Sequence, residues 1–342
     1  MTAPADLLNL AAPVDVVVMA AGKGTRMKSR LPKVLHRLAG RPLVRHVLDT
    51  AAELTARRVT VITGHGADEV EAALSGTGAV PGLDVQFVRQ EPQLGTGHAV
   101  QQAVPTLGDD GVVVVLSGDV PLTRADTLSE LIAACANERL ALLTIDFADP
   151  TGYGRIVRHG EVVQAIVEQK DATPEQRRIT EVYSGIMAVP APLLKTWLAR
   201  LDNQNAQGEY YLTDVVKFAV ADGVPVVAHK IADALQVAGV NSPVQLAELE
   251  RAYQRQVALR LMEQGVRLAD PARLDVRGHL QCAQDVAIDV NCVFEGQVSL
   301  GEGVQVGANC VIRNATIAAG AVIHPFTHIE GGSPGSKDAV EV

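Results

Sequence analysis

Basic residues and glycines gather in one segment, residues 19–33, which reads MAAGKGTRMKSRLPK. Gly22 and Gly24 allow backbone N–H groups to approach an anion closely, and Thr25 adds a hydroxyl donor. Fixed backbone dipoles combined with flexible cations are what a triphosphate requires. The segment therefore predicts a phosphate-binding loop in preference to a solvated basic helix after a tight turn.

The charge pattern around this segment supports that prediction. The whole chain has a net charge of −9, yet no Asp or Glu occurs between Asp15 and Asp49. The acidic total argues against a protein built to coat nucleic acid, and the basic run has no interleaved aromatic residues. A polyanionic substrate would therefore need this local site. The basic run comprises Lys23, Arg26, Lys28, Arg30, Lys33, Arg37, Arg41 and Arg45.

Two familiar phosphate motifs are excluded at this segment. A Walker A loop needs Ser or Thr after its Gly-Lys pair, but Gly24 follows Gly22 and Lys23. A dinucleotide fingerprint needs a third glycine where Met27 stands.

A carboxylate follows another apolar run, at the sequence Ser117-Gly118-Asp119. Mg²⁺ prefers few carboxylates and takes further oxygens from water and substrate phosphates. Asp119 is thus a candidate magnesium ligand, and the alternative is an Asp that caps the following helix.

The segment 93–99, QLGTGHA, is a third candidate. Gly95 and Gly97 flank Thr96 and could admit a flat base, whereas the alternative is an ordinary helix cap by Thr96. His98 is expected to pack at the helix start, not to act as a catalytic base.

The elements that must position these segments alternate along the chain. Short apolar runs predict strands at 14–19, 58–62, 85–88, 112–116 and 140–145, and helical patterns occupy 41–54, 67–74, 97–104 and 123–136. This alternation predicts a doubly wound, mostly parallel, Rossmann-like α/β sheet, in which ligands bind beyond the carboxyl ends of the strands. A hairpin insertion is expected within 153–189, followed by helices at 209–221 and 243–264.

The pattern changes again after about residue 275. Apolar residues recur every six positions, which is the signature of a parallel β-helix, with an irregular β-rich tail as the alternative. The glycine-rich stretch from residue 331 onward is expected to be irregular. The recurring positions are Cys282, Ile288, Phe294, Leu300, Val306 and Ile312, and, after a slip of one residue, Ile317, Ile323 and Ile329.

Composition sets the remaining bounds. The chain has 342 residues, 47% of them hydrophobic, which is enough for two or three domains. Its four cysteines form no CxxC pair, so neither a zinc site nor a disulfide framework is indicated. The N-terminus lacks the basic start of a signal peptide and no apolar stretch approaches 18 residues, so a cytoplasmic protein is expected.

Taken together, these segments resemble one family, the bifunctional UDP-N-acetylglucosamine pyrophosphorylase and glucosamine-1-phosphate N-acetyltransferase. The similarity runs from about residue 14 to about 330. The matching stretches, in family order, are AAGKGTRM, LPK, GTGHA, GDVPL, DPTGYGRI, IVEQKDAT, NAQGEYYLTD and GVN.

The resemblance implies a function. The enzyme would transfer the uridylyl group of UTP to N-acetylglucosamine 1-phosphate with Mg²⁺, releasing pyrophosphate and feeding peptidoglycan and lipopolysaccharide synthesis. It also implies a nucleotidyltransferase sheet, then a long helix and the first turns of a left-handed β-helix.

The resemblance also implies roles for single residues. Catalysis would depend on Arg26, Lys33 and Asp119, and Asp119 and Asn241 would bind Mg²⁺. The substrate-binding residues would be Met19, Ala20, Ala21, Gly22, Lys33, Gln90, Gly95, Thr96, Ser117, Gly118, Asp119, Gly154, Glu168, Tyr183 and Asn241.

One position departs from the family pattern. The family often has Asn where Tyr183 stands in Glu181-Val182-Tyr183-Ser184-Gly185. A Tyr can hydrogen-bond a sugar hydroxyl and stack on its apolar face, so the sugar contact is expected to differ. One alternative is therefore a nucleotidyltransferase for another sugar 1-phosphate or nucleotide, and a second is a hexapeptide-repeat acyltransferase.

The expected domains are an extension at 1–13, the uridylyltransferase at 14–241, a helical linker at 242–274, a truncated β-helix at 275–330 and a tail at 331–342. Because the family's acetyl-CoA residues would lie beyond residue 342, we expect uridylyl transfer without acetyl transfer; retention of the acetyltransferase is the alternative. The family's homotrimer is expected to be weakened by the short β-helix.

Overall fold

The computed structural model describes residues 12–76 and 80–331. Of the expected 1–13 extension, residues 1–11 lie outside these ranges. Of the expected tail at 331–342, residues 332–342 lie outside them. The chain divides into two compact units: residues 1–35 with 43–241, and residues 36–42 with 242–342. In the described ranges, no helix has the length and apolar character needed to cross a lipid bilayer.

The first unit is built on one nine-stranded sheet, whose main path runs β11-β7-β10-β6-β1-β4-β5. β10 runs antiparallel to β6 and β7, and the other neighbours on this path are parallel. The predicted doubly wound, mostly parallel sheet is therefore confirmed. The strands of the main path are β1 Val14–Met19, β4 Arg58–Thr63, β5 Val85–Arg89, β6 Val112–Ser117, β7 Leu140–Asp146, β10 Glu181–Pro190 and β11 Val226–Ile231.

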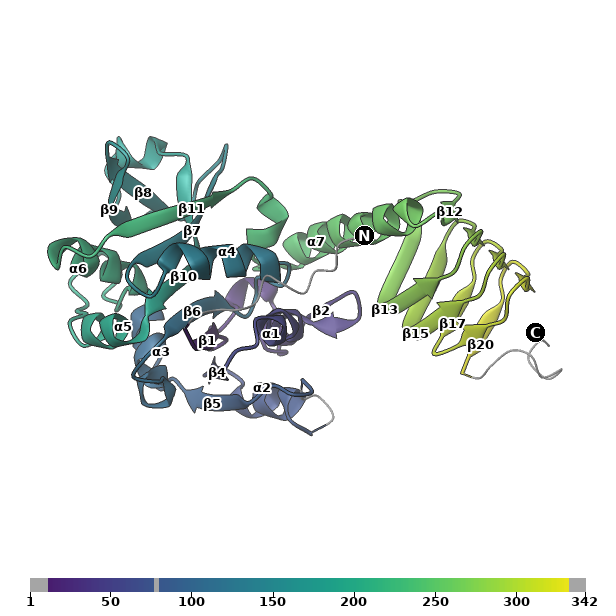
Figure 1. The fold of residues 1–342 in the computed structure, drawn as a ribbon, viewed down its shortest axis with the longest axis horizontal. Coiled ribbons are helices and arrows are strands. Elements are labelled where there is room, and N and C mark those ends of the chain that lie inside the picture. The colour runs from purple at the N-terminus through teal and green to yellow at the C-terminus, as the bar shows by residue number, and fades with distance from the viewer. Residues whose placement is uncertain (1–11, 77–79, 332–342) are drawn as a thin grey trace. The chain divides into compact units, whose positions relative to one another are not determined.

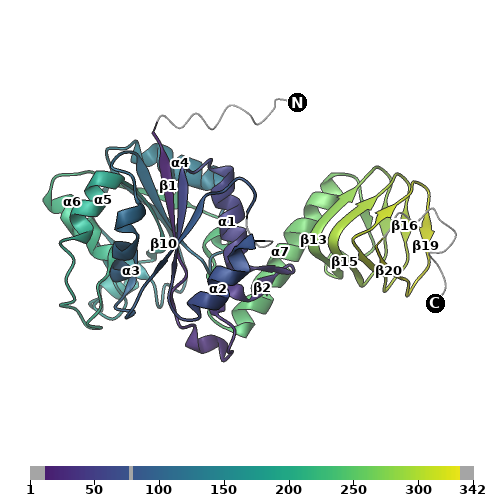
Figure 2. The ribbon, with the colours of Figure 1, turned by 90° about the horizontal axis from the view of Figure 1, so that it is seen from below.

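Helices cover both faces of this sheet (Figure 2). Alternate valines of β1 and β6 point to opposite faces, so that Val16 and Val114 join one core while Val17 and Val115 join the other. Strands buried on both faces explain the continuous apolar runs in the sequence. The first core includes α1 Leu43–Glu53, α2 Ala67–Leu74 and α4 Ala125–Cys135, and the second includes α3 Thr96–Ala103, α5 Ala191–Leu198 and α6 Val215–Ala221.

The structure corrects two expected helices. The helix expected at 41–54 begins only at Leu43, because Arg41 and Pro42 form β3, which pairs with β2, Arg37–Leu38. The helix expected at 209–221 begins only at Val215, after a 3-10 turn at Leu212–Asp214. Tyr210 is held out of that helix because its N–H donates to Leu94 and its carbonyl accepts from Gly97.

The expected hairpin insertion is also shorter than predicted. Only β8, Gly154–His159, and β9, Val162–Val167, form the hairpin, which pairs with β10 through β8. β10 itself lies inside the central sheet between β6 and β7. β10 is a core strand of ten largely buried residues. Its position in the middle of the sheet could not be predicted from the length of the strand.

The longer segment of the second unit begins with α7, Pro243–Glu263, where Ser242 accepts a hydrogen bond from the Gln245 N–H as the N-cap. Parallel strands follow in two stacks (Figure 1). These strands confirm the predicted onset of a β-helix. They are β12 Arg267–Leu268, β13 Leu274–Cys282, β14 Ala287–Ile288, β15 Cys292–Leu300, β16 Gln305–Val306, β17 Val311–Arg313, β18 Thr316–Ile317, β19 Val322–Ile323 and β20 His328–Glu330.

The hexad positions line the inside of this solenoid. Most of them are buried, and Cys282 and Ile323 pack partly buried against the same core. Successive coils pass close together at the glycines: a Cβ on Gly301 would lie 2.6 Å from the Ala319 nitrogen, and one on Gly307 would lie 2.6 Å from the Pro325 nitrogen. Small residues are required there for steric reasons.

The one-residue slip in the hexad pattern has a structural cause at Asn314. Val293 pairs with Val311, eighteen residues on, but Ser299 pairs with Thr316, only seventeen residues on. Asn314 adopts a left-handed backbone with φ of 48°, and its side-chain oxygen accepts a hydrogen bond from the Gln297 N–H at 3.1 Å. A side-chain carbonyl thus satisfies a backbone donor where the coil is one residue short.

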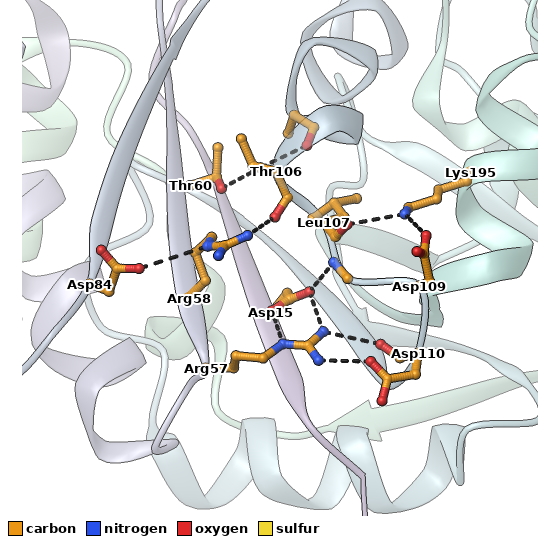
Figure 3. Close-up of polar contacts among 12 residues, drawn as sticks. Asp15, Arg57, Arg58, Thr60, Asp84, Thr106, Leu107, Asp109, Asp110 and Lys195 are labelled. Carbon is orange, nitrogen blue, oxygen red and sulfur yellow. Dashed lines mark hydrogen bonds and ion pairs between the residues drawn. The ribbon is translucent and has the colours of Figure 1, made fainter.

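A buried carboxylate joins the strand ends at the edge of the sheet where β1 begins (Figure 3). Asp15, 2% exposed, accepts hydrogen bonds from Arg57 at 2.8 and 2.9 Å and from the Gly108 N–H at 2.8 Å. Burial raises the pKa of this carboxyl, but the bonds from Arg57 and Gly108 outweigh burial, and the net pKa is lowered.

We therefore expect Asp15→Asn to lower the free energy of unfolding at pH 7 by about 1–3 kcal/mol. A carboxylate with a lowered folded-state pKa stabilises the fold above its unfolded pKa of about 4, and this contribution is lost as pH falls through the folded pKa. Urea unfolding at pH 7 and at pH 3 should show the gap between variant and wild type closing in acid. Asp84→Asn, in an exposed pair with Arg58 at 3.7 Å, is the control. A gap that does not change with pH would contradict this role.

Candidate active site

Three strands end side by side and define the edge at which the candidate site lies. Met19 of β1 is in register with Ile62 of β4 and Ser117 of β6. The next residues stay linked, because the Ala20 N–H donates to Ile62 and the Gly118 N–H donates to the Met19 carbonyl, both at 2.9 Å. The glycine-rich loop and the Asp119 segment therefore leave the sheet next to each other.

The glycine-rich loop is shaped by Gly24. Its backbone is left-handed, with φ of 57°, and an added Cβ would lie 2.7 Å from the Cβ of Lys33. Gly22 differs, since nothing lies within 4 Å of the place its Cβ would occupy. Gly24 thus lets Lys33 fold back over the loop, and Gly22 leaves open space for a ligand.

A pocket of about 320 Å³ opens at this edge. Most of the nucleotide and phosphate residues predicted from the resemblance line it. They are Met19, Ala20, Ala21, Gly22, Lys33, Gln90, Gly95, Thr96 and Asp119. The structure adds Val34 and Glu209, which sequence reasoning missed, and it places Gln93 and Ala99 of the candidate segment 93–99 in the lining as well.

One ammonium group and two side chains with oxygen acceptors converge at the pocket. The Lys33 ammonium pairs with the Asp119 carboxylate and donates to the side-chain oxygen of Asn241 at 3.1 Å. Asn241 reaches this point because the Val240 N–H donates to the Asp119 carbonyl at 3.0 Å. A carboxylate and an amide oxygen suit Mg²⁺, which takes its remaining ligands from water and phosphate. Among the described residues, no three His, Cys, Asp or Glu side chains are grouped so that they could hold a metal ion.

Asp119 does not cap the following helix, because α4 begins at Ala125 after Arg124 as its N-cap. Thr96 likewise does not cap α3; its hydroxyl accepts a hydrogen bond from the Leu212 N–H at 3.0 Å. Both side chains are therefore placed by contacts other than the helix caps that were the alternatives.

One wall of the pocket is built from the segment after β5. Gln90 is 3% exposed, and its amide nitrogen donates to the Gly95 carbonyl at 2.9 Å. That nitrogen also lies 3.2 Å from Nδ1 of His98, which places His98 behind the wall as a packing residue. Gly95 has φ of 112°, a backbone that an L side chain rarely adopts.

A second group of predicted residues assembles around Glu168. Gly154 pairs with Tyr183 across β8 and β10, and a Cβ on Gly154 would lie 3.6 Å from one Glu168 carboxylate oxygen. The Thr213 hydroxyl donates to Glu168 at 3.0 Å. Burial raises the pKa of Glu168, and the charges of Asp171 and Asp214 add to the rise.

Tyr183 is 7% exposed, and its hydroxyl oxygen is buried without a hydrogen-bond partner among the described residues. Burial raises its pKa well above the usual value, and the charge of Glu168 adds to this. A buried hydroxyl with no partner is costly, so it commonly marks a place that a ligand completes.

Three more predicted residues lie neither in the pocket lining nor in the group around Glu168. Arg26 lies in a 3-10 turn, Thr25–Met27, is exposed and does not line the pocket. Ser117 lies behind it, with its hydroxyl 3.5 Å from the position of a Cβ on Gly185. Gly118 packs against the Met19 carbonyl, which a Cβ would approach to 3.2 Å.

Comparison with known proteins identifies the family. A family model described as the MobA-like NTP transferase domain matches residues 16–256. The bifunctional protein GlmU of Albidiferax ferrireducens is 83% identical over 330 residues, covering 96% of this chain and 71% of that protein. The bifunctional protein GlmU of Polaromonas naphthalenivorans is 72% identical over 324 residues, covering 93% of this chain and 68% of that protein.

The chain belongs to the GlmU family. Membership confirms the prediction of a uridylyltransferase that makes UDP-N-acetylglucosamine for cell-wall synthesis. The GlmU relatives named above are longer than this chain, which spans about 70% of their length.

Solved structures agree with the GlmU fold. A UDP-glucose pyrophosphorylase from Acinetobacter baumanii superposes with a TM-score of 0.56 at 22% identity, covering 73% of this chain and 99% of that one. A UDP-glucose pyrophosphorylase complexed with UDP-glucose gives 0.59 at 18% identity, covering 71% and 99%. At these identities the likeness shows the nucleotidyltransferase fold alone.

The geometry of this GlmU pocket predicts that Gly95→Ala distorts its wall. The new Cβ would lie 2.6 Å from the Tyr210 carbonyl oxygen, on a backbone with positive φ. We expect a loss of about 1–3 kcal/mol in the free energy of unfolding, measured by urea titration. Gly22→Ala is the matched control, because its Cβ has free space and should leave stability unchanged while weakening UTP binding. A Gly95→Ala protein as stable as the wild type would contradict the strained geometry.

Proposed function

We propose that uridylyl transfer takes place in the pocket between the glycine-rich loop and the Gln90–Thr96 wall, and that Asp119 and Asn241 hold the Mg²⁺ it uses. The single observation that carries this proposal is the convergence of Lys33, Asp119 and Asn241 beside the open space at Gly22. Cations and oxygen ligands meet there at the carboxyl edge of the sheet, where such sheets bind their ligands.

The proposed reaction needs no general base, because the nucleophile is already an anion. A phosphate oxygen of N-acetylglucosamine 1-phosphate attacks the α-phosphorus of UTP in line. A new P–O bond forms, the bond to the bridging oxygen breaks, and pyrophosphate leaves with the electron pair. When bound, Mg²⁺ supplies charge neutralisation on the phosphates of both substrates. The chain's own contribution is positioning and electrostatic stabilisation.

Each part of the pocket has a task in this reaction. The backbone at 20–22 and the segment around Gln90 and Gly95 would hold the uridine. Lys33, which is partly exposed beside Asp119, can exchange its internal ion pair for the charge that builds on the leaving pyrophosphate. Arg26, on the exposed turn after Gly24, would reach the phosphates from outside the pocket lining.

The sugar end is proposed to lie at Gly154, Glu168 and Tyr183. Its character is different from the phosphate end, because Tyr183 is buried, Glu168 is half-buried, and burial raises the pKa of Glu168. Burial raises the pKa of Tyr153, and the charge of Asp119 adds to the rise. We propose a cytoplasmic enzyme, and the homotrimer expected from the resemblance stays a prediction.

The metal assignment is tested by Asp119→Ala. Pyrophosphate release from UTP, measured with N-acetylglucosamine 1-phosphate in the presence and absence of Mg²⁺, should fall by about a hundredfold or more because charge on the phosphates is no longer balanced. Asp109→Ala, which removes an exposed carboxylate paired with Lys195 at 2.7 Å, is the matched control and should keep its activity. Near-normal Mg²⁺-dependent turnover by Asp119→Ala would rule the assignment out.

The sugar end is tested by Tyr183→Phe. The fold should be as stable as the wild type, because the lost hydroxyl has no partner among the described residues. If a sugar hydroxyl is its partner, the KM for N-acetylglucosamine 1-phosphate should rise about tenfold while the KM for UTP stays the same.

The control for Tyr183→Phe is Tyr211→Phe, whose hydroxyl donates to Asp171 at 3.1 Å, so that its loss should reduce stability. Other sugar 1-phosphates and nucleoside triphosphates should be assayed in the same panel. A sugar KM that does not respond to Tyr183→Phe would exclude this contact.

A further inference from the structure

A second cavity lies entirely within the second unit. It has a volume of about 450 Å³ and is larger than the pocket of the nucleotidyltransferase unit. Residues from α7, from β13 and β15, and from the β2–β3 hairpin line it. Figure 1 shows α7 beside β13. A cavity of this size is in the range of small-molecule sites.

The walls of this cavity are fixed by hydrogen bonds at the open edge of β13. Gln254 of α7 is 2% exposed; its amide nitrogen donates to the Val276 carbonyl at 2.9 Å and its oxygen accepts from the Val276 N–H at 2.8 Å. Glu250 accepts from Gln254 at 2.8 Å and from the Ala39 N–H of the hairpin at 2.7 Å. Because all three segments are tied together, the cavity is preformed.

The lining combines an apolar floor with a basic and amide-bearing rim. Val257, Leu261 and Val276 supply the floor. The rim carries Arg41, Arg260, His279, Gln264 and Gln297, with the ring of Tyr253 beside them. Neither Asp nor Glu is among the lining residues, although the chain as a whole is acidic.

Neighbouring charges are already paired and leave Arg260 available. Arg277 donates to Glu295 at 3.0 Å, and Asp275 is ion-paired with Arg251. Within the described ranges, Arg260 has no ion-pair partner. A guanidinium on a concave, acid-free surface is suited to a phosphate, which it can bind with two parallel hydrogen bonds.

We propose that this cavity binds a nucleotide-sized phosphate ester, with its phosphates on Arg260 and Arg41 and its ring on the floor beside Tyr253. The site is separate from the uridylyl-transfer pocket and does not depend on that function. The proposed site also gives a role to Arg41 of the basic run, which is not among the residues assigned to the reaction.

The test uses the full chain and ADP as the probe, with binding measured by calorimetry. Arg260→Gln should weaken ADP binding about tenfold or more, and the affinity of the wild type should fall as salt is raised. The matched control is Arg255→Gln: Arg255 is also an exposed arginine of α7 but does not line the cavity, so ADP binding should match the wild type. Adenosine, which lacks phosphate, should not bind.

Three results would overturn the proposal. The first is a wild-type protein that does not bind ADP. The second is an equal ADP affinity in Arg260→Gln and wild type, because ADP would then bind elsewhere. Pyrophosphate binding as tightly as ADP would show a site for inorganic anions only. Uridylyl transfer by Arg260→Gln should stay at the wild-type rate, so a failure here and a failure of the proposed reaction can be told apart.

Discussion

The parallel register of β1 with β4 and β6 is the constraint on which the site depends. Because Met19, Ile62 and Ser117 end at the same level, the loops that follow have to leave the sheet together. Neither the glycine-rich loop nor the Asp119 segment would be a site alone. β1 can hold this central place because valines of its two faces enter two different cores, which fixes the strand from both sides.

The site divides into two electrostatic environments. At one end, an ammonium and a carboxylate are partly open to water, so each can change partners when phosphates arrive. At the other end, Tyr183 is buried and Glu168 is half-buried, and burial favours their neutral forms. A substrate with a charged end and a sugar end fits this division, and the second environment forms where the hairpin β8–β9 pairs with β10 of the central sheet.

Much of this arrangement could be predicted from the sequence, for identifiable reasons. Strands buried on both faces leave apolar runs, and a solenoid leaves a period of six, so the sheet and the β-helix onset could be inferred. The start of α6 at Val215 instead of Glu209 could not be predicted from the sequence. Tyr210 is kept out of the helix by hydrogen bonds with Leu94 and Gly97, which are more than a hundred residues away. Glu209 was missed for a related reason, since its place in the pocket follows from this long-range contact.

The coil that is one residue short at Asn314 shows how a solenoid tolerates a change of length. The deletion is confined to a corner: the strands on both sides of it keep their parallel pairing, and the buried positions stay in phase. A single asparagine suffices, because its left-handed backbone turns the chain and its side chain restores the missing acceptor. Corners of this kind would let an evolving repeat protein gain or lose residues one at a time, without rebuilding the stack of coils below.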